Sequence, residues 1–347
     1  KTRKDEKNRR ENTSCQINIT SASVYESKKP NSEVVEAMKN AEQLGMSSTI
    51  FSSRNMKTFD GDLKKIEAIT KPIAENWLKE NDIHYLDLIL GKPWCGSEGW
   101  YVDDKNLNIE EFIFKYSGPF WKKTVDVIVP FFNEEGNIQK AHYQNKKCER
   151  LFNINKYIYV ENGSTDKTRE KLKEVAKIDS KISLVLLDQN VGYGGGLKAG
   201  LKNSSSQIIA LNHGDLQFDL YNFIVSNIET IKNHGSLNIL SKRLNRSNID
   251  IFNSAILRGL LSLIFRKKIL DFNGQPKIFY KELLGQIDDL PDNFCADLAI
   301  YLKISGEAVN IPSLQKERNV GTSSWSSSLF KRIKIFLEYI FWGIKNK

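Results

Sequence analysis

The sequence lacks the features that mark a disulfide-rich, zinc-binding or membrane-spanning protein. Its four cysteines, at positions 15, 95, 148 and 295, form no C-x-x-C pair, so neither a disulfide framework nor a zinc site is predicted. A reducing cytosol is therefore the expected environment. No run approaches the roughly 20 apolar residues that are needed to cross a bilayer. The first residues, KTRKDEKNRRENTS, lack the apolar core of a secretory signal.

The composition is that of a globular protein rather than a disordered or fibrous chain. Apolar residues make up 40% of the 347 positions and charged residues 27%. At a prior of roughly 150 residues per domain, this length suggests two domains. The net charge of +9 favours anionic partners, such as nucleic acid, phosphorylated substrates or an anionic membrane surface.

Two α/β segments are predicted, with a linker near KYSGPF (115–120), where Gly and Pro break the pattern. In the first, residues 31–45 have helical spacing and end on Gly45, as a C-cap would. STIFSS (48–53), LDLIL (86–90) and GWYVDD (99–104) are strand candidates, and residues 62–81 are amphipathic. In the second, the apolar runs at 124–132, 157–162, 182–188 and 206–212 alternate with helical stretches. This alternation predicts a mostly parallel sheet covered by helices.

Polar clusters follow each strand of the second segment: FNEEGN, ENGSTD, DQNVGYGGG and HGDLQ. Ligands of parallel sheets bind at the carboxyl ends of the strands, so an active site is predicted there. After the last of these strands, His213, Asp215 and Gln217 alternate and could face one side. Their shared object would be Mg²⁺ or Mn²⁺. The alternatives are a His213 that bonds a backbone group and an Asp215 that only stabilises a turn.

These four clusters, in this order and spacing, resemble family 2 glycosyltransferases, and most closely the branch that includes dolichyl-phosphate mannose synthase. The resemblance covers about Thr124 to Arg318. It implies a GT-A fold over residues 119–347 that binds a nucleotide-diphosphate sugar with Mg²⁺ or Mn²⁺ and inverts the anomeric centre. His213 stands in place of the first Asp of the family's D-x-D-x-Q metal element. The residues expected to contact the donor are Pro130, Phe132, Asn133, Glu134, Glu161, Asn162, Gly192 and Gly194.

Some of these motifs also admit simpler readings. ENGSTD alone would indicate only a turn and a helix N-cap. Gly194, Gly196 and Ala199 satisfy the weak dinucleotide fingerprint G-x-G-x-x-A, but a Rossmann site normally follows the first strand of its domain. In the glycosyltransferase interpretation, the glycines let the backbone approach the donor closely.

Three further residues take roles from the resemblance. Asp297 falls where inverting members place a catalytic carboxylate, which would be a general base for a sugar hydroxyl or would orient an acceptor that is already a phosphate. Lys277 and Arg318 are candidate phosphate contacts. The alternatives are a solvated Lys277 and an Asp297 that only favours the start of a helix.

Two amphipathic stretches, 254–269 and 328–347, combine broad apolar faces with Lys and Arg. Such helices lie in a membrane interface or pack into a core. Membrane contact is the expectation for the second, which carries Phe336, Tyr339, Phe341 and Trp342.

The front segment, 1–118, resembles the capsule-biosynthesis phosphatases of the haloacid dehalogenase superfamily, from about Cys15 to Phe112. The resemblance assigns the phosphate-holding hydroxyl to Ser52 or Ser53 and the cation to Lys92. However, Asn18 and Thr20 replace the two catalytic carboxylates, and an amide cannot form an acyl-phosphate. A degenerate, ligand-binding or bracing module is therefore predicted, and truncation or an error near the start is the alternative. The remaining candidates are Asp103 and Asp104, the Mg²⁺ carboxylates.

The predicted protein is thus α/β with two domains, a haloacid dehalogenase-like Rossmannoid domain followed by a GT-A domain. Its expected activity is metal-dependent, inverting sugar transfer to a polyprenyl-phosphate or glycan acceptor in capsular polysaccharide synthesis. It would be peripheral at the inner face of the plasma membrane and would bind no nucleic acid. The rivals are a sugar-phosphate phosphatase with an appended binding domain and a non-catalytic scaffold.

Overall fold

The computed structural model describes residues 29–93, 107–235, 237–317 and 329–347. The chain divides into two compact units, Lys1–Trp121 and Lys122–Lys347. The candidates Asn18, Thr20, Asp103 and Asp104, the strand predicted at 99–104, and Arg318 lie outside the described residues.

The first unit pairs two short parallel strands, β1 (Thr49–Ser52) and β2 (Asp87–Leu90), in agreement with two of its predicted strands. Asn31 caps the start of α2 (Ser32–Gln43), because its side chain accepts hydrogen bonds from the backbone N–H groups of Glu33 and Val34. Trp77, Leu78, Ile66 and Leu88 are buried together in a small core. The other helices are α3 (Leu63–Lys65), the π-helical turn η2 (Ile66–Thr70), α4 (Lys71–Glu80) and α5 (Ile109–Ser117).

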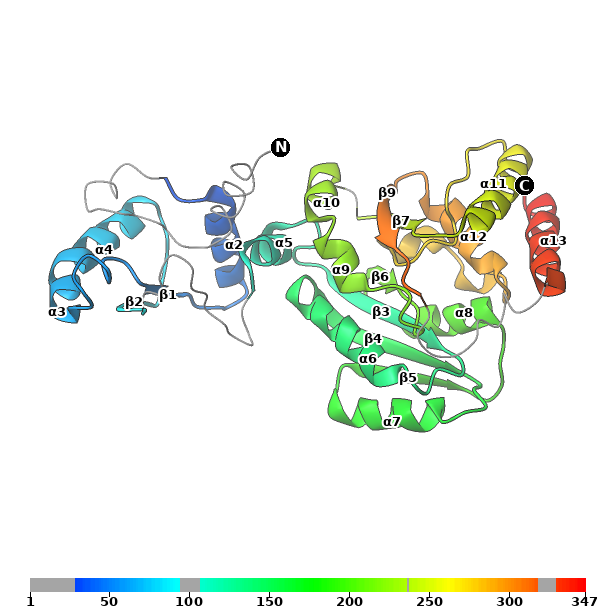
Figure 1. Ribbon diagram of the computed structural model, residues 1–347, viewed down its shortest axis with the longest axis horizontal. Helices are drawn as coiled ribbons and strands as arrows, with labels where there is room; N and C mark the ends of the chain where they lie inside the picture. Colours follow the sequence, from blue (N-terminus) through cyan, green and yellow to red (C-terminus); the bar gives the residue numbers. More distant parts are fainter. Residues whose placement is uncertain (1–28, 94–106, 236, 318–328) are drawn as a thin grey trace. The chain divides into compact units, whose positions relative to one another are not determined.

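The second unit is built on a seven-stranded sheet of order β5-β4-β3-β6-β8-β7-β9 (Figure 1). The first four of these strands are parallel, which confirms the predicted alternation, while β8 runs antiparallel to both of its neighbours. The strands are β3 (Thr124–Phe131), β4 (Asn153–Asn162), β5 (Ile182–Leu187), β6 (Ile208–Leu211), β7 (Ile239–Leu244), β8 (Lys277–Tyr280) and β9 (Val309–Leu314).

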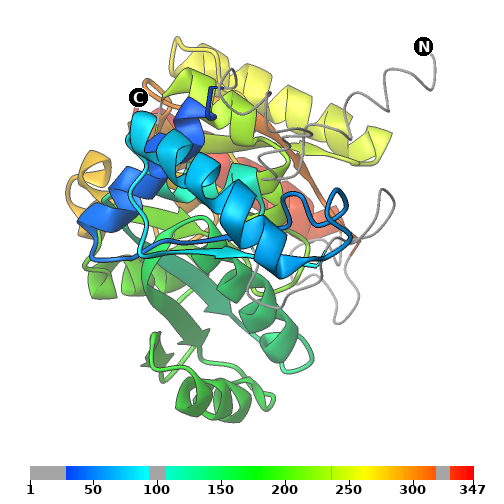
Figure 2. The same ribbon diagram turned by 90° about the vertical axis from the view of Figure 1, so that its left-hand side faces the viewer.

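Helices cover both faces of this sheet. α6 (Ile138–Lys146) and α7 (Thr168–Ile178) contact each other on one face, and α8 (Tyr193–Asn203) lies on the other, as expected for right-handed crossovers. α7 lies beside β4 and β5 in both views (Figures 1 and 2). The remaining elements are η3 (Lys147–Arg150), α9 (Leu220–Val225), α10 (Ile228–His234), α11 (Asn248–Ile264), η4 (Lys281–Leu284), η5 (Ile287–Asp289), α12 (Cys295–Ile304) and α13 (Leu329–Lys345).

The order of the strands reverses at the β3–β6 boundary. From β3 the chain moves outward to β4 and β5, and then returns across β3 to β6. In open α/β sheets this switch point leaves a crevice at the carboxyl ends of the strands, where ligands bind. The fold therefore gathers the loops after β3, β4, β5 and β6 at one place, as the sequence predicted.

α11 and α13 pack against each other near the C-terminal end of the second unit (Figure 1). Gly343 allows the close approach, because a Cβ atom there would lie 3.2 Å from a methyl group of Leu261. Tyr339 is buried, and its hydroxyl donates to the backbone carbonyl of Phe294 at 3.0 Å. One face of each helix is therefore core, as the packing alternative expected, while the other face bears exposed apolar side chains. No helix in the described parts of the chain has the length and apolar character needed to cross a bilayer.

Candidate functional site

The segment after β6 leaves the strand at once and forms a tight turn. Gly214 fits because a Cβ atom there would lie 2.4 Å from the ring of Phe131. The backbone N–H of Gln217 donates to Asp215 Oδ1 at 3.1 Å, and Leu216 has a positive φ of 62°. The expectation that strand alternation aligns three side chains is therefore wrong. The side chain of Gln217 instead donates to the carbonyl of Lys316 at 3.3 Å.

His213 hydrogen-bonds a side chain rather than the backbone. Its Nε2 lies 3.0 Å from the hydroxyl of Tyr193, the first residue of α8, and the two rings meet edge to face at 82°. Burial lowers the pKa of His213, although the charge of Asp215 opposes this effect. His213 and Asp215 therefore lie close to each other at the switch point.

Asp297, in the first turn of α12, is the acceptor in a buried ion pair. Lys277 Nζ lies 2.6 Å from its Oδ1, and Gln275 Nε2 donates to the same oxygen at 3.1 Å. The alternative of a solvated Lys277 is wrong, because this side chain is fully buried. Burial lowers the pKa of Lys277, and Asp297 opposes that shift. A proton transferred to Asp297 would leave the buried ammonium unpaired, which is costly.

Arg243, at the end of β7, was missed in the sequence analysis. It forms a two-pronged ion pair with Asp271, with Nη2 to Oδ1 at 2.8 Å and Nε to Oδ2 at 3.0 Å. Burial raises the pKa of Asp271, but the hydrogen bonds and the charge of Arg243 outweigh it and hold this pKa low. The sequence did hold one indication of its role. Arg243 lies near the end of a strand, where the other polar clusters of this unit also occur.

The loops after β3 and β4 bind each other. The backbone N–H of Asn133 donates to Ser164 Oγ at 3.1 Å. In the opposite direction, the N–H of Thr165 donates to Asn133 Oδ1 at 2.9 Å. Glu134 is buried, and its carboxylate accepts from Asn137 Nδ2 at 2.6 Å. Of the predicted donor contacts, Asn133 is exposed, Pro130 and Phe132 are half-buried, and Glu134 belongs to the scaffold of the loop.

Glu161 and Asn162 are turned inward. Glu161 is fully buried, accepts from the N–H of Ser164 at 2.5 Å, and pairs with Arg169 at 2.6 Å. Asn162 accepts from the N–H of Val191 at 3.1 Å and thereby fixes the start of the glycine loop. Contrary to the sequence expectation, the carboxylate of Glu161 presents no surface to a base or ribose, because Arg169 and the turn occupy it.

The glycines of the loop after β5 make a close contact that the sequence did not indicate. Gly192 has φ of 83°, and a Cβ atom there would lie 2.4 Å from the carbonyl oxygen of Asp292. A Cβ atom on Gly194 would lie 2.0 Å from the carbonyl oxygen of Pro291. Both glycines make room for the segment before α12, and the ring of Tyr193 stacks on Phe294 of that segment. Their predicted approach to a donor stays a prediction.

Two side chains at the end of β6, His213 and Asp215, are the candidates to hold a divalent cation. Across residues 29–93, 107–235, 237–317 and 329–347, no three His, Cys, Asp or Glu side chains cluster as a complete metal site. His213 and Asp215 nevertheless supply an imidazole and a carboxylate at the switch point. A cation held there would complete its shell with diphosphate oxygens and water, which is how Mg²⁺ is bound by one or two carboxylates and substrate phosphates.

In the first unit, the predicted Ser52 and Lys92 lie together at the carboxyl ends of β1 and β2. The backbone N–H of Lys92 donates to the carbonyl of Ser52 at 3.0 Å. Arg54, which the sequence analysis did not single out, is buried beside them, and its backbone N–H donates to Ser52 Oγ at 3.2 Å. Three potential anion ligands thus share this edge.

Comparison with known proteins shows what the second unit is similar to. Residues 126–283 match the family model described as "Glycosyl transferase family 2". The putative glycosyltransferase CsbB of Bacillus subtilis is 23% identical over 59% of this chain and 63% of its own length. The undecaprenyl-phosphate 4-deoxy-4-formamido-L-arabinose transferase of Proteus mirabilis is 30% identical over 27% of this chain and 29% of its own. The chain therefore spans less than two thirds of the length of either relative.

Among solved structures, glucosyl-3-phosphoglycerate synthase from Mycobacterium tuberculosis, in complex with Mn²⁺, uridine diphosphate and glucosyl-3-phosphoglycerate, is 15% identical. The match covers 71% of this chain and 85% of that chain, with a TM-score of 0.48. Residues 126–283 are thus similar to glycosyl transferase family 2, and they lie on a mixed α/β fold.

Proposed function

We propose that this chain, on the strength of its similarity to glycosyl transferase family 2, transfers a sugar from a nucleotide-diphosphate sugar with inversion. The observation that carries the proposal is the grouping of His213 and Asp215 with Tyr193 and Asp297 at the β3–β6 switch point. A donor bound in the crevice would present its diphosphate to this group. Asn133, exposed after β3, and the half-buried Phe132 are the proposed contacts of the nucleotide.

The proposed chemistry is separation of charge between a sugar cation and a leaving diphosphate. Mg²⁺ or Mn²⁺ bound at His213 and Asp215 would neutralise the negative charge that develops on the leaving diphosphate. The chain's own side chains hold the rest of the site in place. Lys277 keeps a positive charge fixed beside Asp297. Gln275 Nε2 bridges Asp297 and the hydroxyl of Tyr193, which in turn hydrogen-bonds His213.

Polyprenyl phosphate is the proposed acceptor. A phosphate acceptor is already ionised and needs no general base, whereas a sugar hydroxyl must lose a proton. Asp297 is bound by Lys277 and Gln275, so it is suited to orienting an acceptor rather than to taking its proton. The Proteus relative is named for transfer to undecaprenyl phosphate, which supports the same choice. Assembly of a surface polysaccharide, such as a capsule, is the proposed setting.

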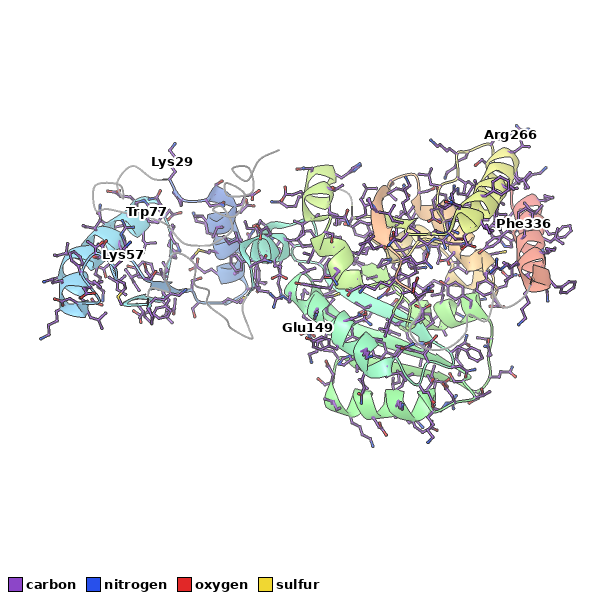
Figure 3. All side chains as sticks on the ribbon, viewed as in Figure 1. Lys29, Lys57, Trp77, Glu149, Arg266 and Phe336 are labelled. Carbon is purple, nitrogen blue, oxygen red and sulfur yellow. The ribbon has the colours of Figure 1, made fainter. Side chains whose placement is uncertain are left out.

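The proposed location is the inner face of the plasma membrane, through α11 and α13. Each helix exposes apolar side chains at steps of three and four, and therefore along one face. Exposed cations adjoin both stripes, a pattern that favours anionic lipid. Figure 3 labels Arg266, directly after α11, and Phe336, within α13. The stripes consist of Ile249, Phe252, Ile256, Leu260 and Leu263 on α11, and of Phe330, Ile333, Leu337, Phe341 and Ile344 on α13.

For the first unit we propose a degenerate haloacid dehalogenase-like module that binds a phosphorylated ligand without hydrolysing it. Its support is the position of a hydroxyl and two basic residues, Ser52, Arg54 and Lys92, at one strand edge. The replacement of two catalytic carboxylates by Asn18 and Thr20 supports the loss of hydrolysis. The proposed domain limits are 1–118 and 119–347.

The test follows nucleotide diphosphate release from a panel of nucleotide sugars with Mn²⁺, with a polyprenyl phosphate or a glycan as acceptor. We expect release with the polyprenyl phosphate, and a loss of about 100-fold or more in Asp215→Asn. Glu174→Gln, an exposed carboxylate on α7, is the matched control and should leave the rate unchanged.

Release with the glycan alone would contradict the proposed acceptor. No release with any donor would contradict the transferase. Phosphate release from sugar phosphates would support the phosphatase alternative.

A further inference from the structure

The turn that leads into α12 determines where Asp297 lies. Residues 291–294, which precede this helix, belong to neither a helix nor a strand. The backbone N–H of Asp297 donates to the carbonyl of Phe294 at 3.3 Å. The side chain of Asn293 accepts from the backbone N–H of Cys295 at 3.0 Å. Because the first turn of α12 depends on these groups, the position of Asp297 depends on whatever holds residues 291–294 in place.

The core face of α13 holds this turn. The hydroxyl of Tyr339 donates to the same carbonyl of Phe294, at 3.0 Å, and it lies 3.1 Å from the amide oxygen of Asn273. The ring of Tyr339 meets Phe272 edge to face, with the centroids 5.1 Å apart. A carbonyl oxygen has two lone pairs, so it can accept from Asp297 and from Tyr339 at the same time. One buried phenol thus joins α13 to the turn that places Asp297.

The hydroxyl of Tyr339 also contacts the segment that carries the partners of Asp297. Asn273 lies two positions before Gln275 and four before Lys277. Both of these side chains donate to Asp297, at 3.1 and 2.6 Å. Tyr339 therefore touches both of the chain segments between which this buried cluster of hydrogen bonds forms.

The two faces of α13 are suited to two different tasks. Leu337 and Phe341 belong to the exposed apolar stripe, and each lies two positions from the buried Tyr339. At about 100° per residue, Tyr339 lies on the side of the helix opposite the stripe. A lipid surface that contacts the stripe would therefore leave the Tyr339 hydroxyl in the core.

We infer that Tyr339 is a positioning residue for the transfer reaction, and that α13 helps to build the catalytic centre as well as contacting lipid. The inference rests on the proposed function, in which Asp297 orients the acceptor phosphate. Without the hydroxyl, the carbonyl of Phe294 loses a partner and Asp297 is free to shift relative to Lys277. A displacement of about 1 Å can slow a reaction about 100-fold, even when the altered residue lies far from the reacting atoms.

The experiment compares Tyr339→Phe with a matched control, Tyr157→Phe, in the full chain. Tyr157 on β4 is also buried, and its hydroxyl donates to Glu149 Oε1 at 3.1 Å. Nucleotide diphosphate release is measured with UDP-, GDP-, ADP-, CDP- and dTDP-linked hexoses, Mn²⁺, and undecaprenyl phosphate in vesicles with acidic phospholipid. Tyr339→Phe should lower kcat about 10- to 100-fold, while the KM of the nucleotide sugar and the binding to vesicles stay unchanged. Tyr157→Phe should leave kcat unchanged.

Hydrogen exchange tests the positioning without turnover. In Tyr339→Phe, the peptide 293–300 should exchange about three- to tenfold faster than in the unmodified chain, because one hydrogen bond that holds the turn is lost. Tyr157→Phe should not change the exchange of this peptide. Asn273→Ala, which removes the other partner of the hydroxyl, should shift kcat and exchange in the same direction, and it decides the matter if Tyr339→Phe does not fold.

The outcomes separate the inference from the proposed function. An unchanged kcat in a folded Tyr339→Phe, or an equal fall of kcat in both tyrosine variants, would overturn the inference and leave the transferase proposal standing. Faster exchange without a fall of kcat would make Tyr339 a residue of the fold alone, which also overturns it. Absence of nucleotide diphosphate release from the unmodified chain would instead overturn the proposed function.

Discussion

At the scale of single residues, the site contains two buried ion pairs whose partners could not be matched from the sequence. Lys277 and Asp297 were singled out separately in the sequence and lie 20 positions apart, while Arg243 and Asp271 lie 28 positions apart. Pairing across such separations depends on the order of β7, β8 and α12 in space. Sequence spacing shows which residues are polar at the end of a strand, but it does not show which of them neutralise each other.

The buried Arg243–Asp271 pair yields a stability prediction. Asp271→Ala leaves the Arg243 guanidinium buried without its partner, so the free energy of unfolding should fall by about 3–5 kcal/mol. The double variant Arg243→Met/Asp271→Leu should recover most of that loss. Urea unfolding followed by circular dichroism measures both. Asp288→Ala, which breaks an exposed pair with Lys202, is the control and should change little. If Asp271→Ala and Asp288→Ala lowered the free energy of unfolding equally, the importance of the buried pair would be contradicted.

At the scale of elements, the loops between strands and helices are held by their glycines and by each other. The sequence correctly placed a glycine-rich turn between β5 and α8, and it assigned the glycines to a ligand. In the structure, Gly192 and Gly194 lie against the backbone of residues 291 and 292. A contact between segments almost 100 positions apart leaves no local signal in the sequence.

This close packing is tested by adding a methyl group. In Gly194→Ala the new Cβ would meet the carbonyl oxygens of Pro291 and Asn293, at 2.0 and 2.7 Å, and backbone cannot move aside easily. We expect a loss of about 1–3 kcal/mol in the free energy of unfolding. Gly259→Ala in α11 meets nothing within 4 Å and should gain about 0.5–1 kcal/mol. Thermal unfolding of both variants decides the matter, and a neutral Gly194→Ala would show that the 291–293 segment is not fixed there.

At the scale of the whole molecule, the charge and the apolar stripes favour an anionic lipid surface. The chain carries +9 overall, and Lys267, Lys268 and Lys334 lie exposed beside the stripes. Large exposed apolar patches rimmed by charge are typical of interaction sites. The sequence identified both helices as amphipathic. Only the packing of α11 against α13 shows that each keeps a second, unburied apolar face.

Vesicle sedimentation checks this surface. Phe252 and Phe341 are 65% and 66% exposed, and burying one phenylalanine contributes about 1.5–3 kcal/mol. Phe252→Glu and Phe341→Glu should therefore each weaken binding to vesicles with acidic phospholipid at least about tenfold. Ile178→Glu changes an even more exposed apolar residue, on α7, and should bind like the unmodified chain. Loss of binding in all three variants alike would point to a general charge effect.

The sequence by itself determined the alternation of strands and helices over residues 124–212, and therefore the edge at which a site must lie. This was possible because apolar runs and the polar clusters that follow them are local patterns. Tertiary structure alone decided which side chains face the crevice. It turned Glu161 inward to Arg169, buried Lys277 against Asp297, and joined His213 to Tyr193. The physical reason is that desolvation forces each buried charge or polar atom to find a partner, and that partner is supplied by whichever segment the fold brings near.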